Sequence, residues 1–374
     1  MKNIKHWTAI AVMSLVSPFC MAQRGNSAAS ISPLSENEVP LFITIGQSNA
    51  DGSAFADVEE DRRLAAWYDN PEANSGRMKI WYRSCYIVNQ PDGARWVFDG
   101  TTEDVAPGWL DLYYRNDNRN GKTLMNMIHG YGTWSEGAAG RRGMEGEFGM
   151  HFRQAFPGQE LYVVKLGCSG SNIESWASPS DSHNWDYFYE KLYKPAVNDL
   201  LSKGKIPRLA GIWWMQGEGN RGDDKAHYLA LLKQLIGKCR TMLGFPDAHI
   251  YIGHVVKPGE NPEQPKASTQ YGQGVREAQD AVVQPQGADF IPNVSVIDAR
   301  ESPFDKDNLH WSHIGINRIG KKIATEVISA GRRGEWAVFC PSAFKRFAAC
   351  QHAGSDDACL VSQLGEDDGG VLAH

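Results

Sequence analysis

The chain has 374 residues, and its apolar content is that of an ordinary globular protein with room for one large domain. Its formal charge of −6 gives no basic footprint, which argues against nucleic acid as a partner. Twelve tryptophans and thirteen tyrosines are many for this length. Such rings pack in cores by default, but exposed ones can stack on sugars.

The first 22 residues have the pattern of a secretory signal. Two lysines precede an apolar run over residues 9–16, and small residues end the segment at Ala22. The run is too short to span a bilayer. Cys20 would suit a lipoprotein, but the bulky Phe19 before it disfavours that reading. We therefore expect cleavage after Ala22, export to the periplasm or the extracellular space, and no stable membrane span afterwards.

Six cysteines follow the signal: Cys85, Cys168, Cys239, Cys340, Cys350 and Cys359. An exported protein meets an oxidising environment in which cysteines form disulfides. None of the six has the C-x-x-C spacing of zinc or redox sites, so the sequence predicts no metal site. The last three crowd the tail and predict one disulfide there, while the pairing among all six stays open.

The first strand leads into a polar turn. Residues 23–39 are rich in Ser, Asn, Ala and Glu and are expected to be a linker, after which Leu41–Ile45 has the residues of a buried strand. Gly46 can form the tight turn that ends it, and Ser48 then lies at the carboxyl end of the strand. Ligands bind beyond that end in open α/β sheets, although a serine there is often only a helix cap.

A helical turn after Ser48 and two short strands, at 78–83 and 94–98, come before a long irregular segment over residues 99–143. Long loops on compact domains are often binding loops. Five aromatic residues punctuate this one: Trp109, Tyr113, Tyr114, Tyr131 and Trp134. Either these rings line a binding surface or they pack the insertion onto the body of the domain.

From residue 146 strands and helices alternate regularly. Apolar strands are predicted at 160–166, 209–215, 249–256 and 294–298, and helices at 146–156, 187–201, 225–243, 271–283 and 313–328. Such alternation predicts an α/β fold in which a parallel sheet is covered on both faces. The main domain therefore covers residues 40–330. Residues 331–374 lose the pattern and are expected to be a cysteine-containing appendage with a disordered end.

Three polar stretches follow strands of this predicted sheet. Asp307 and His310 lie between the last strand and the last helix, where the carboxylate can fix the tautomer of the imidazole and leave Nε2 as a base for a serine. A tryptophan-containing strand ends in Gln216-Gly217-Glu218, whose glutamine can donate to an oxyanion. Glu218 is either a second acid or a residue that orders its loop. Residues 165–176 bring a third, glycine-containing loop to the same edge.

Taken together, these motifs resemble the SGNH (GDSL-like) hydrolases, and within them the sialate O-acetylesterase and carbohydrate esterase family 6 (acetylxylan esterase) branch. The resemblance is carried by residues 46–49 (Gly-Gln-Ser-Asn), by Gln216-Gly217-Glu218, by Asp307-x-x-His310 and by residues 275–279, and it extends over roughly residues 40–330. It implies a three-layer α/β/α sandwich with a mainly parallel five-stranded sheet.

The resemblance also implies roles for named residues. Ser48 would be the nucleophile, His310 the general base and then acid, and Asp307 the residue that orients His310. The oxyanion hole would use the N–H groups of Ser48 and Gly170 and the side chain of Gln216. The remaining polar residues of these motifs would support the site, namely Gln47, Asn49 and Glu218. Here Gly219-Asn220 follow where Ser-Asp is usual, which calls into question the hydrogen bonding of that loop.

The sequence thus predicts a secreted serine esterase that removes O-acetyl groups from carbohydrate, with no cofactor. The substrate stays open between acetylated xylan and O-acetylated sialic acid, as do the acyl chain length and the oligomeric state. Three alternatives remain. The same fold could act on a lipid or peptidoglycan ester, the chain could be a catalytically silent carbohydrate-binding domain, or Ser48 could be only a helix cap.

Overall fold

The computed structural model describes residues 34–52, 54–55, 62–70, 77–90, 93–98, 108–112, 117–119, 122–124, 141–256, 271–305, 307–342 and 344. The predicted signal peptide, with its cleavage site and Cys20, lies outside these residues. So do most of the predicted insertion and the chain beyond residue 344. The predictions for those segments stay predictions.

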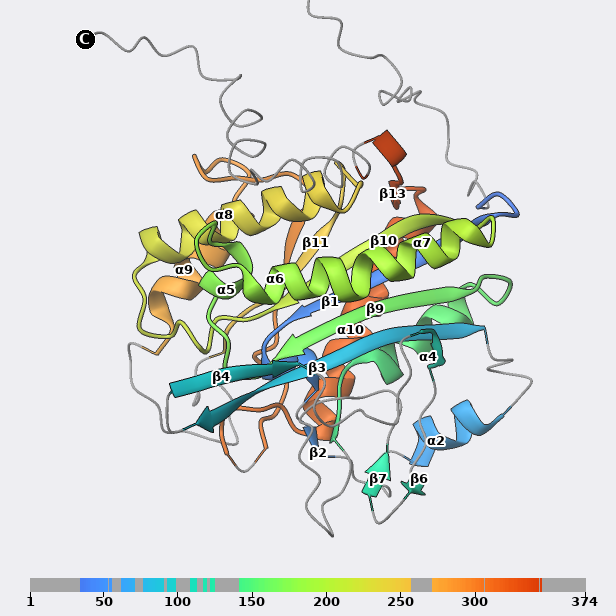
Figure 1. The fold of residues 1–374 in the computed structure, drawn as a ribbon, viewed down its shortest axis with the longest axis horizontal. Coiled ribbons are helices and arrows are strands. Elements are labelled where there is room, and N and C mark those ends of the chain that lie inside the picture. Colours follow the sequence, from blue (N-terminus) through green and yellow to red (C-terminus); the bar gives the residue numbers. More distant parts are fainter. Residues whose placement is uncertain are drawn as a thin grey trace, which may run out of the picture. The chain divides into compact units, whose positions relative to one another are not determined.

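The described fold is built on one large sheet with the strand order β12-β11-β10-β1-β9-β3-β4 (Figure 1). Six of these strands run parallel, namely β1 (Glu38–Gly46), β3 (Met78–Gln90), β9 (Leu161–Cys168), β10 (Ile206–Met215), β11 (Ile250–Gly253) and β12 (Val294–Ile297). The predicted α/β sandwich with a mainly parallel sheet is confirmed. The sheet exceeds the implied five strands because β3 pairs in parallel with β9.

Antiparallel strands complete the sheet at three places: β4 (Gly93–Phe98) and β5 (Leu110–Asp111) pair with β3, and β13 (Ala337–Val338) pairs with β10. Two small separate ribbons join β2 (Ala54–Phe55) to β8 (Arg141–Arg142) and β6 (Asp117–Arg119) to β7 (Lys122–Leu124).

Strand β1 is the centre of the sheet, and its sequence explains why. Its residues from Val39 onwards are buried, with Ile43 and Ile45 in the core on one face of the sheet and Phe42 in the core on the other. A strand buried on both faces has to be apolar almost throughout. β9 lies on one side of β1 and β10 on the other, so loops that follow β1, β9 and β10 meet at one edge.

Helices cover both faces of the sheet (Figure 1). One layer contains α5 (Glu174–Ala177), α6 (His183–Tyr187), α7 (Lys194–Ser202), α8 (Lys225–Met242) and α9 (Gln273–Ala281). The other contains α2 (Arg62–Asp69), α4 (Glu145–Ala155) and α10 (His313–Arg332). The predicted helix over 187–201 is divided, because a π-helical turn (Phe188–Tyr193) separates α6 from α7.

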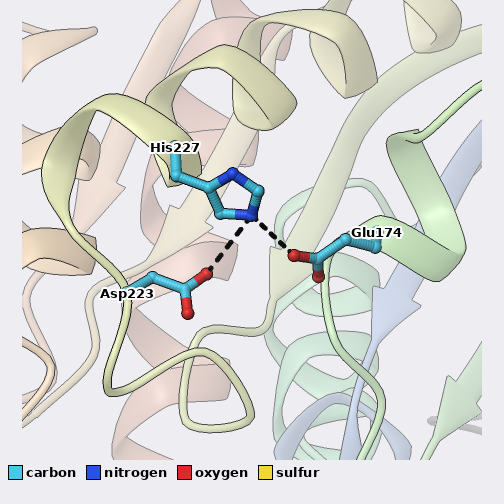
Figure 2. Close-up of side chains that lie close together, drawn as sticks. All are labelled: Glu174, Asp223 and His227. Atoms are coloured by element: carbon cyan, nitrogen blue, oxygen red, sulfur yellow. Dashed lines mark hydrogen bonds and ion pairs between the residues drawn. The ribbon is translucent and has the colours of Figure 1, made fainter.

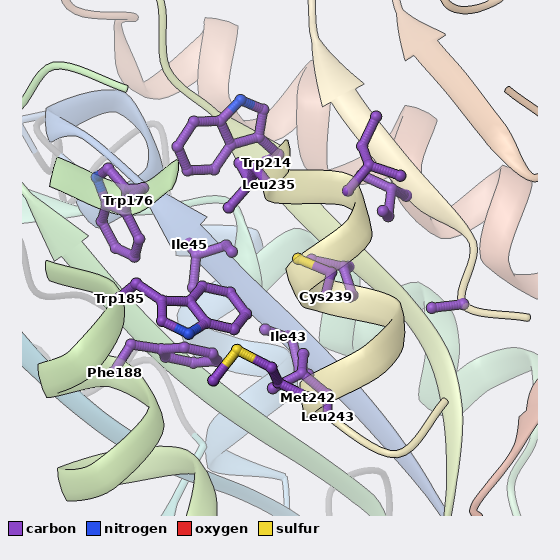
Figure 3. Close-up of a cluster of buried hydrophobic side chains, with 14 of the residues drawn as sticks. Ile43, Ile45, Trp176, Trp185, Phe188, Trp214, Leu235, Cys239, Met242 and Leu243 are labelled. Carbon is purple, nitrogen blue, oxygen red and sulfur yellow. The ribbon is translucent and has the colours of Figure 1, made fainter. Parts of the chain in front are cut away.

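Large aromatic residues fill the core beneath the first helix layer (Figure 3). Trp176 and Trp214 meet edge to face with ring centroids 5.6 Å apart, and Trp185 lies fully buried beside Phe188. Burial of each such ring contributes about 4 to 6 kcal/mol before entropy costs. Many of the tryptophans counted in the sequence therefore stabilise the fold.

Two predicted boundaries differ in the structure. β1 begins at Glu38, inside the expected linker, because Ile206 N donates to Asn37 O and so extends the pairing with β10. The predicted appendage also starts too early. β13 pairs with β10, and Trp336 stacks on Phe152 with centroids 5.7 Å apart. Trp336, β13 and Phe344 therefore belong to the main domain.

Trp109, in the predicted insertion, packs against the body of the domain. Its Nε1 donates to Asp199 Oδ2 at 2.9 Å, and its ring meets Tyr162 edge to face at 4.8 Å. This ring fits the packing alternative, and the other four aromatics lie outside the described residues. Cys168 is buried and disulfide-bonded, whereas Cys239 is a buried free thiol. No helix in the described part of the chain is long and apolar enough to cross a membrane.

Candidate active site

The short helix α1 (Ser48–Asp51) begins directly at the carboxyl end of β1. Gly46 ends the strand with φ +144°, and a Cβ there would lie 2.0 Å from Met215 O of the neighbouring strand. Only glycine fits this close approach. The next residue donates from its backbone N to the same Met215 O at 2.9 Å, so the turn is tied to β10. Ser48 is thereby held at the edge where ligands bind in open α/β sheets.

The loop that carries His310 follows β12 and returns to the same edge. Asn308 has φ +56°, a left-handed conformation that asparagine tolerates better than most residues. A bridge between Phe304 and Trp311 closes the loop, and Ser312 then caps α10 by accepting from Gly315 N at 3.2 Å. The sequence therefore specifies a tight polar turn before the last helix.

Ser48, His310 and Asp307 form one line of hydrogen bonds. The Ser48 hydroxyl lies 2.9 Å from His310 Nε2, and His310 Nδ1 lies 2.6 Å from Asp307 Oδ2. The carboxylate can only accept, so Nδ1 carries the proton and Nε2 is left as the acceptor for the hydroxyl. Ser48 is 3% exposed and His310 9% exposed. This geometry allows the imidazole to take the serine proton.

Asp307 is fixed by its own loop. Its Oδ1 accepts from the backbone N of both Leu309 and His310, each at 2.9 Å. Partial burial acts to raise the pKa of Asp307, but the hydrogen bonds from the His310 backbone and ring and from Leu309 outweigh it and hold the pKa below its usual value. Asp307 is therefore ionised at neutral pH, as an orienting group for a histidine must be.

Asn49 and Glu218 lie next to this line. Asn49 Nδ2 donates to Glu218 Oε1 at 2.7 Å and to Leu309 O at 3.2 Å, and Asn49 Oδ1 accepts from Trp311 N at 3.3 Å. Burial raises the pKa of Glu218, although the hydrogen bond from Asn49 and the nearby His310 lower it in part. These two predicted supporting residues both lie beside the loop that carries His310.

Gln216 is not placed as expected of an oxyanion donor. It is fully buried, and its Nε2 donates to Ser171 O at 3.0 Å and to Asn220 Oδ1 at 2.7 Å. Its Oε1 accepts from Tyr228 OH at 3.0 Å. Both amide hydrogens are therefore already used within the protein. In this arrangement Gln216 holds its own loop in place, which speaks against its predicted role as a donor to an oxyanion.

The third predicted supporting residue, Gln47, also orders this loop. Its Oε1 accepts from Gly219 N at 3.1 Å and from Gly217 N at 3.4 Å, across from β1 to the turn after β10. The side chain is 3% exposed. Gln47 therefore connects the turn that carries Ser48 to the Gln-Gly-Glu turn.

Gly170 lies in the turn after β9 with φ +76°, between Cys168 and Ser171, whose N donates to Cys168 O at 3.1 Å. A left-handed glycine of this kind lets the backbone approach a ligand closely. The neighbouring Ser169 is buried, and its hydroxyl has no hydrogen-bond partner in the described part of the chain. The donor role of Gly170 stays a prediction.

One cluster of titratable groups was not foreseen from the sequence. His227 Nε2 lies 2.7 Å from Glu174 Oε1 and 3.7 Å from Asp223 Oδ2 (Figure 2). The hydrogen bond that the His227 ring donates to Glu174 raises the pKa of His227. Among the described residues these three side chains form the group with the spacing to hold a metal ion. Their mutual contacts pair one imidazole with two carboxylates, so the three side chains also form an ion-pair network.

Asn220 connects this cluster to the Gln-Gly-Glu turn. Its Nδ2 donates to Glu174 Oε2 at 3.1 Å and to Asp223 Oδ2 at 2.8 Å, while its Oδ1 accepts from Gln216 and from Ile173 N. The sequence signalled this residue only as a departure from the usual Ser-Asp. Two of its partners, Ile173 and Glu174, come from another loop, so spacing along the chain could not reveal them.

A groove of about 580 Å³ opens beside the same loop. It is lined by Arg221, Gly222, Asp223, Asp224, Lys225, Tyr271, Gln273, Gly274 and Glu277. Arg221 Nη1 donates to Glu218 O at 3.1 Å, so the groove begins next to the Gln-Gly-Glu turn. The lining offers one aromatic ring and polar groups of both charges.

The fold and the residues at this edge fit a carboxylic ester hydrolase. A family model described as carbohydrate esterase, sialic acid-specific acetylesterase, matches residues 132–329, which is more than half of the chain. The chain belongs to this carbohydrate acetylesterase family. The recognition made from the motifs is confirmed. The matched segment contains Gln216, Asp307 and His310, while Ser48 precedes it.

The solved structures that the chain resembles share little sequence with it. NanS is 16% identical, with 79% of this chain and 98% of that chain covered and a TM-score of 0.44. A protein from Arabidopsis thaliana is 19% identical, with coverage of 78% and 98% and a TM-score of 0.44. A carbohydrate acetylesterase from Xanthomonas citri is 18% identical, with coverage of 79% and 56% and a TM-score of 0.42. The curated proteins gave no match.

Proposed function

We propose that this protein is an exported serine esterase that removes O-acetyl groups from carbohydrate through an acyl-enzyme on Ser48. The observation that carries the proposal is the line of hydrogen bonds from Ser48 Oγ through His310 to Asp307, at 2.9 and 2.6 Å. A serine hydroxyl is a weak nucleophile until a base removes its proton, and this arrangement supplies that base.

In the first half of the reaction Ser48 Oγ attacks the acetyl carbonyl carbon while its proton moves to His310 Nε2. The carbonyl electron pair moves to oxygen, and we assign the resulting oxyanion to the N–H groups of Ser48 and Gly170. Each such donor contributes about 3 kcal/mol to transition-state stabilisation. The bond to the sugar oxygen then breaks, and that oxygen takes the proton from His310.

In the second half water attacks the acetyl-Ser48 carbonyl carbon and gives its proton to His310. The second tetrahedral intermediate collapses, the bond to Ser48 Oγ breaks, and the serine takes the proton back as acetate leaves. Ionised Asp307 stabilises the imidazolium in both halves, because its Oδ2 stays hydrogen-bonded to Nδ1. No step calls on a group beyond the side chains and backbone named here.

The substrate class within acetylated carbohydrate is the finer part of the proposal. Acetylated xylan and O-acetylated sialic acid are both candidates, given the family to which the chain belongs. The groove favours a saccharide as the substrate, because its half-buried Tyr271 ring suits the face of a sugar and the charged and amide groups around the ring suit sugar hydroxyls. Its acidic residues (Asp223, Asp224 and Glu277) outnumber its two basic ones, which favours the neutral xylan chain.

The test is acetate release from acetylated xylo-oligosaccharides and from O-acetylated sialic acids, with p-nitrophenyl acetate as a small reference ester. Ser48→Ala should release no acetate from any of them while circular dichroism shows a folded protein. Tyr271→Ala should raise the KM for the oligosaccharide and leave p-nitrophenyl acetate hydrolysis unchanged. A fully active Ser48→Ala protein would contradict the mechanism.

The same substrates, together with a fluorophosphonate, distinguish two alternative functions. An esterase for lipid or peptidoglycan esters would hydrolyse p-nitrophenyl acetate but release nothing from either sugar. A silent carbohydrate-binding domain would bind the oligosaccharide and fail to react with a fluorophosphonate, because only an activated serine forms that adduct.

A further inference from the structure

Asn49 makes hydrogen bonds to both residues that flank His310 in the chain. Its Nδ2 donates to Leu309 O at 3.2 Å, and its Oδ1 accepts from Trp311 N at 3.3 Å. The side chain is 3% exposed, so water does not compete freely for these bonds. Because Asn49 follows Ser48 directly, the residue next to the serine holds both neighbours of the histidine.

These contacts close a ring through the reacting atoms. One path from Ser48 to His310 is the 2.9 Å hydrogen bond between Oγ and Nε2. The other runs through the Asn49 side chain to the backbone on both sides of His310. Within the loop, the Asp307 carboxylate and the bridge between Phe304 and Trp311 add further bonds. Those internal bonds shape the turn but do not fix its distance from α1.

Glu218 fixes the orientation of the Asn49 amide. Its Oε1 accepts from the same Nδ2 at 2.7 Å, so the nitrogen faces two acceptors and the oxygen faces one donor. A flipped amide would put the asparagine oxygen against Glu218 and Leu309 O. The orientation is therefore settled by three partners from two different loops.

We propose that Asn49 is a positioning residue that sets the separation between Ser48 Oγ and His310 Nε2. The inference rests on the proposed function, since it concerns the same nucleophile and base. It assigns Asn49 no contact with substrate. Its effect is on the step in which the hydroxyl proton moves to the imidazole, and a displacement of about 1 Å at such a pair lowers the rate by about 100-fold.

The principal test is Asn49→Ala, compared with Asn198→Ala on the exposed face of α7 as a matched control. We expect kcat for p-nitrophenyl acetate and the rate of fluorophosphonate labelling to fall by about 100-fold, with KM changed less than about threefold. The low-field NMR signal of the proton between His310 Nδ1 and Asp307 should persist, because that hydrogen bond belongs to the loop itself.

Asn49→Asp serves as a second variant, because it keeps an acceptor for Trp311 N–H and loses both donors. One of its carboxylate oxygens would face Glu218 Oε1 and Leu309 O, both acceptors, so we expect its kcat to be as low as that of Asn49→Ala or lower. Wild-type kcat in both variants would overturn the inference, as would loss of the low-field proton together with unfolding in both. If Ser48→Ala is inactive while both Asn49 variants are fully active, the proposed function survives and the positioning role alone fails.

Discussion

Two polar networks lie at the same edge of the sheet, and they differ in how they end. The line from Asp307 through His310 ends on the Ser48 hydroxyl, which lies 2.9 Å from Nε2 of His310, the base that we propose. The network around Gln216 is closed, because each amide atom of that side chain is already hydrogen-bonded. Position at a strand end therefore does not make a residue reactive. The partners that its polar atoms already have decide between chemistry and support.

Among the changes that we consider, removal of His310, the proposed base, should lower activity most. His310→Ala takes away the acceptor for the Ser48 proton, and kcat should fall by about 10⁶-fold. Stopped assays with p-nitrophenyl acetate measure the loss, with circular dichroism as the control for folding. Retention of more than about a hundredth of wild-type activity would contradict the comparison of the two networks, because the hydrogen bonds from Asp307 through His310 to Ser48 would then not carry the reaction.

Asp307→Asn tests the outer end of the line. An amide in place of the carboxylate no longer fixes Nδ1 as a donor, so kcat should fall by about 10⁴-fold. The lowered pKa of Asp307 also means that the wild-type protein gains stability from this group above the ordinary aspartate pKa and loses it as pH falls through the folded value. Thermal melts should therefore show wild type approaching the variant in acid. An active variant would contradict the orienting role.

Gln216→Leu tests the closed network. It removes the side-chain hydrogen bonds to Ser171 O, Asn220 Oδ1 and Tyr228 OH in a buried site, although Asn220 Oδ1 keeps Ile173 N and Tyr228 OH keeps the backbone oxygen of residue 216. The free energy of unfolding should therefore fall by about 1 to 3 kcal/mol. Urea denaturation measures the change, and Gln154→Leu on the exposed side of α4 is the matched control. A variant with wild-type stability and a kcat reduced by about 100-fold would restore Gln216 to the oxyanion hole.

Glu218→Gln should change stability least among these variants. It tests the contact between Glu218 and Asn49, which joins the two networks. Burial raises the pKa of Glu218, so the folded protein binds this proton more tightly than the unfolded chain does. Its charge therefore costs stability increasingly as pH rises above the ordinary glutamate pKa. Melting temperatures at about pH 4 and about pH 8 should show the variant gaining on wild type as pH rises. A constant or opposite difference would contradict a buried charge at this position.

The strands and helices from residue 146 onwards could be predicted because their apolar periods are regular. Ser48, Asp307 and His310 were found because each follows a strand of the predicted sheet. The partners of Gln216 could not be predicted, because Asn220 and Tyr228 bind it through side chains whose directions depend on the packed fold. The π-helical turn and β13 were missed for a related reason, because packing against distant residues stabilises them.

The most direct test of the central claim is where a fluorophosphonate attaches. Intact mass followed by peptide mapping should show one equivalent bound to Ser48 in the wild-type chain, and none in Ser48→Ala or His310→Ala. Attachment at another residue, or acetate release from acetylated sugar by Ser48→Ala, would contradict the assignment of Ser48 as the nucleophile.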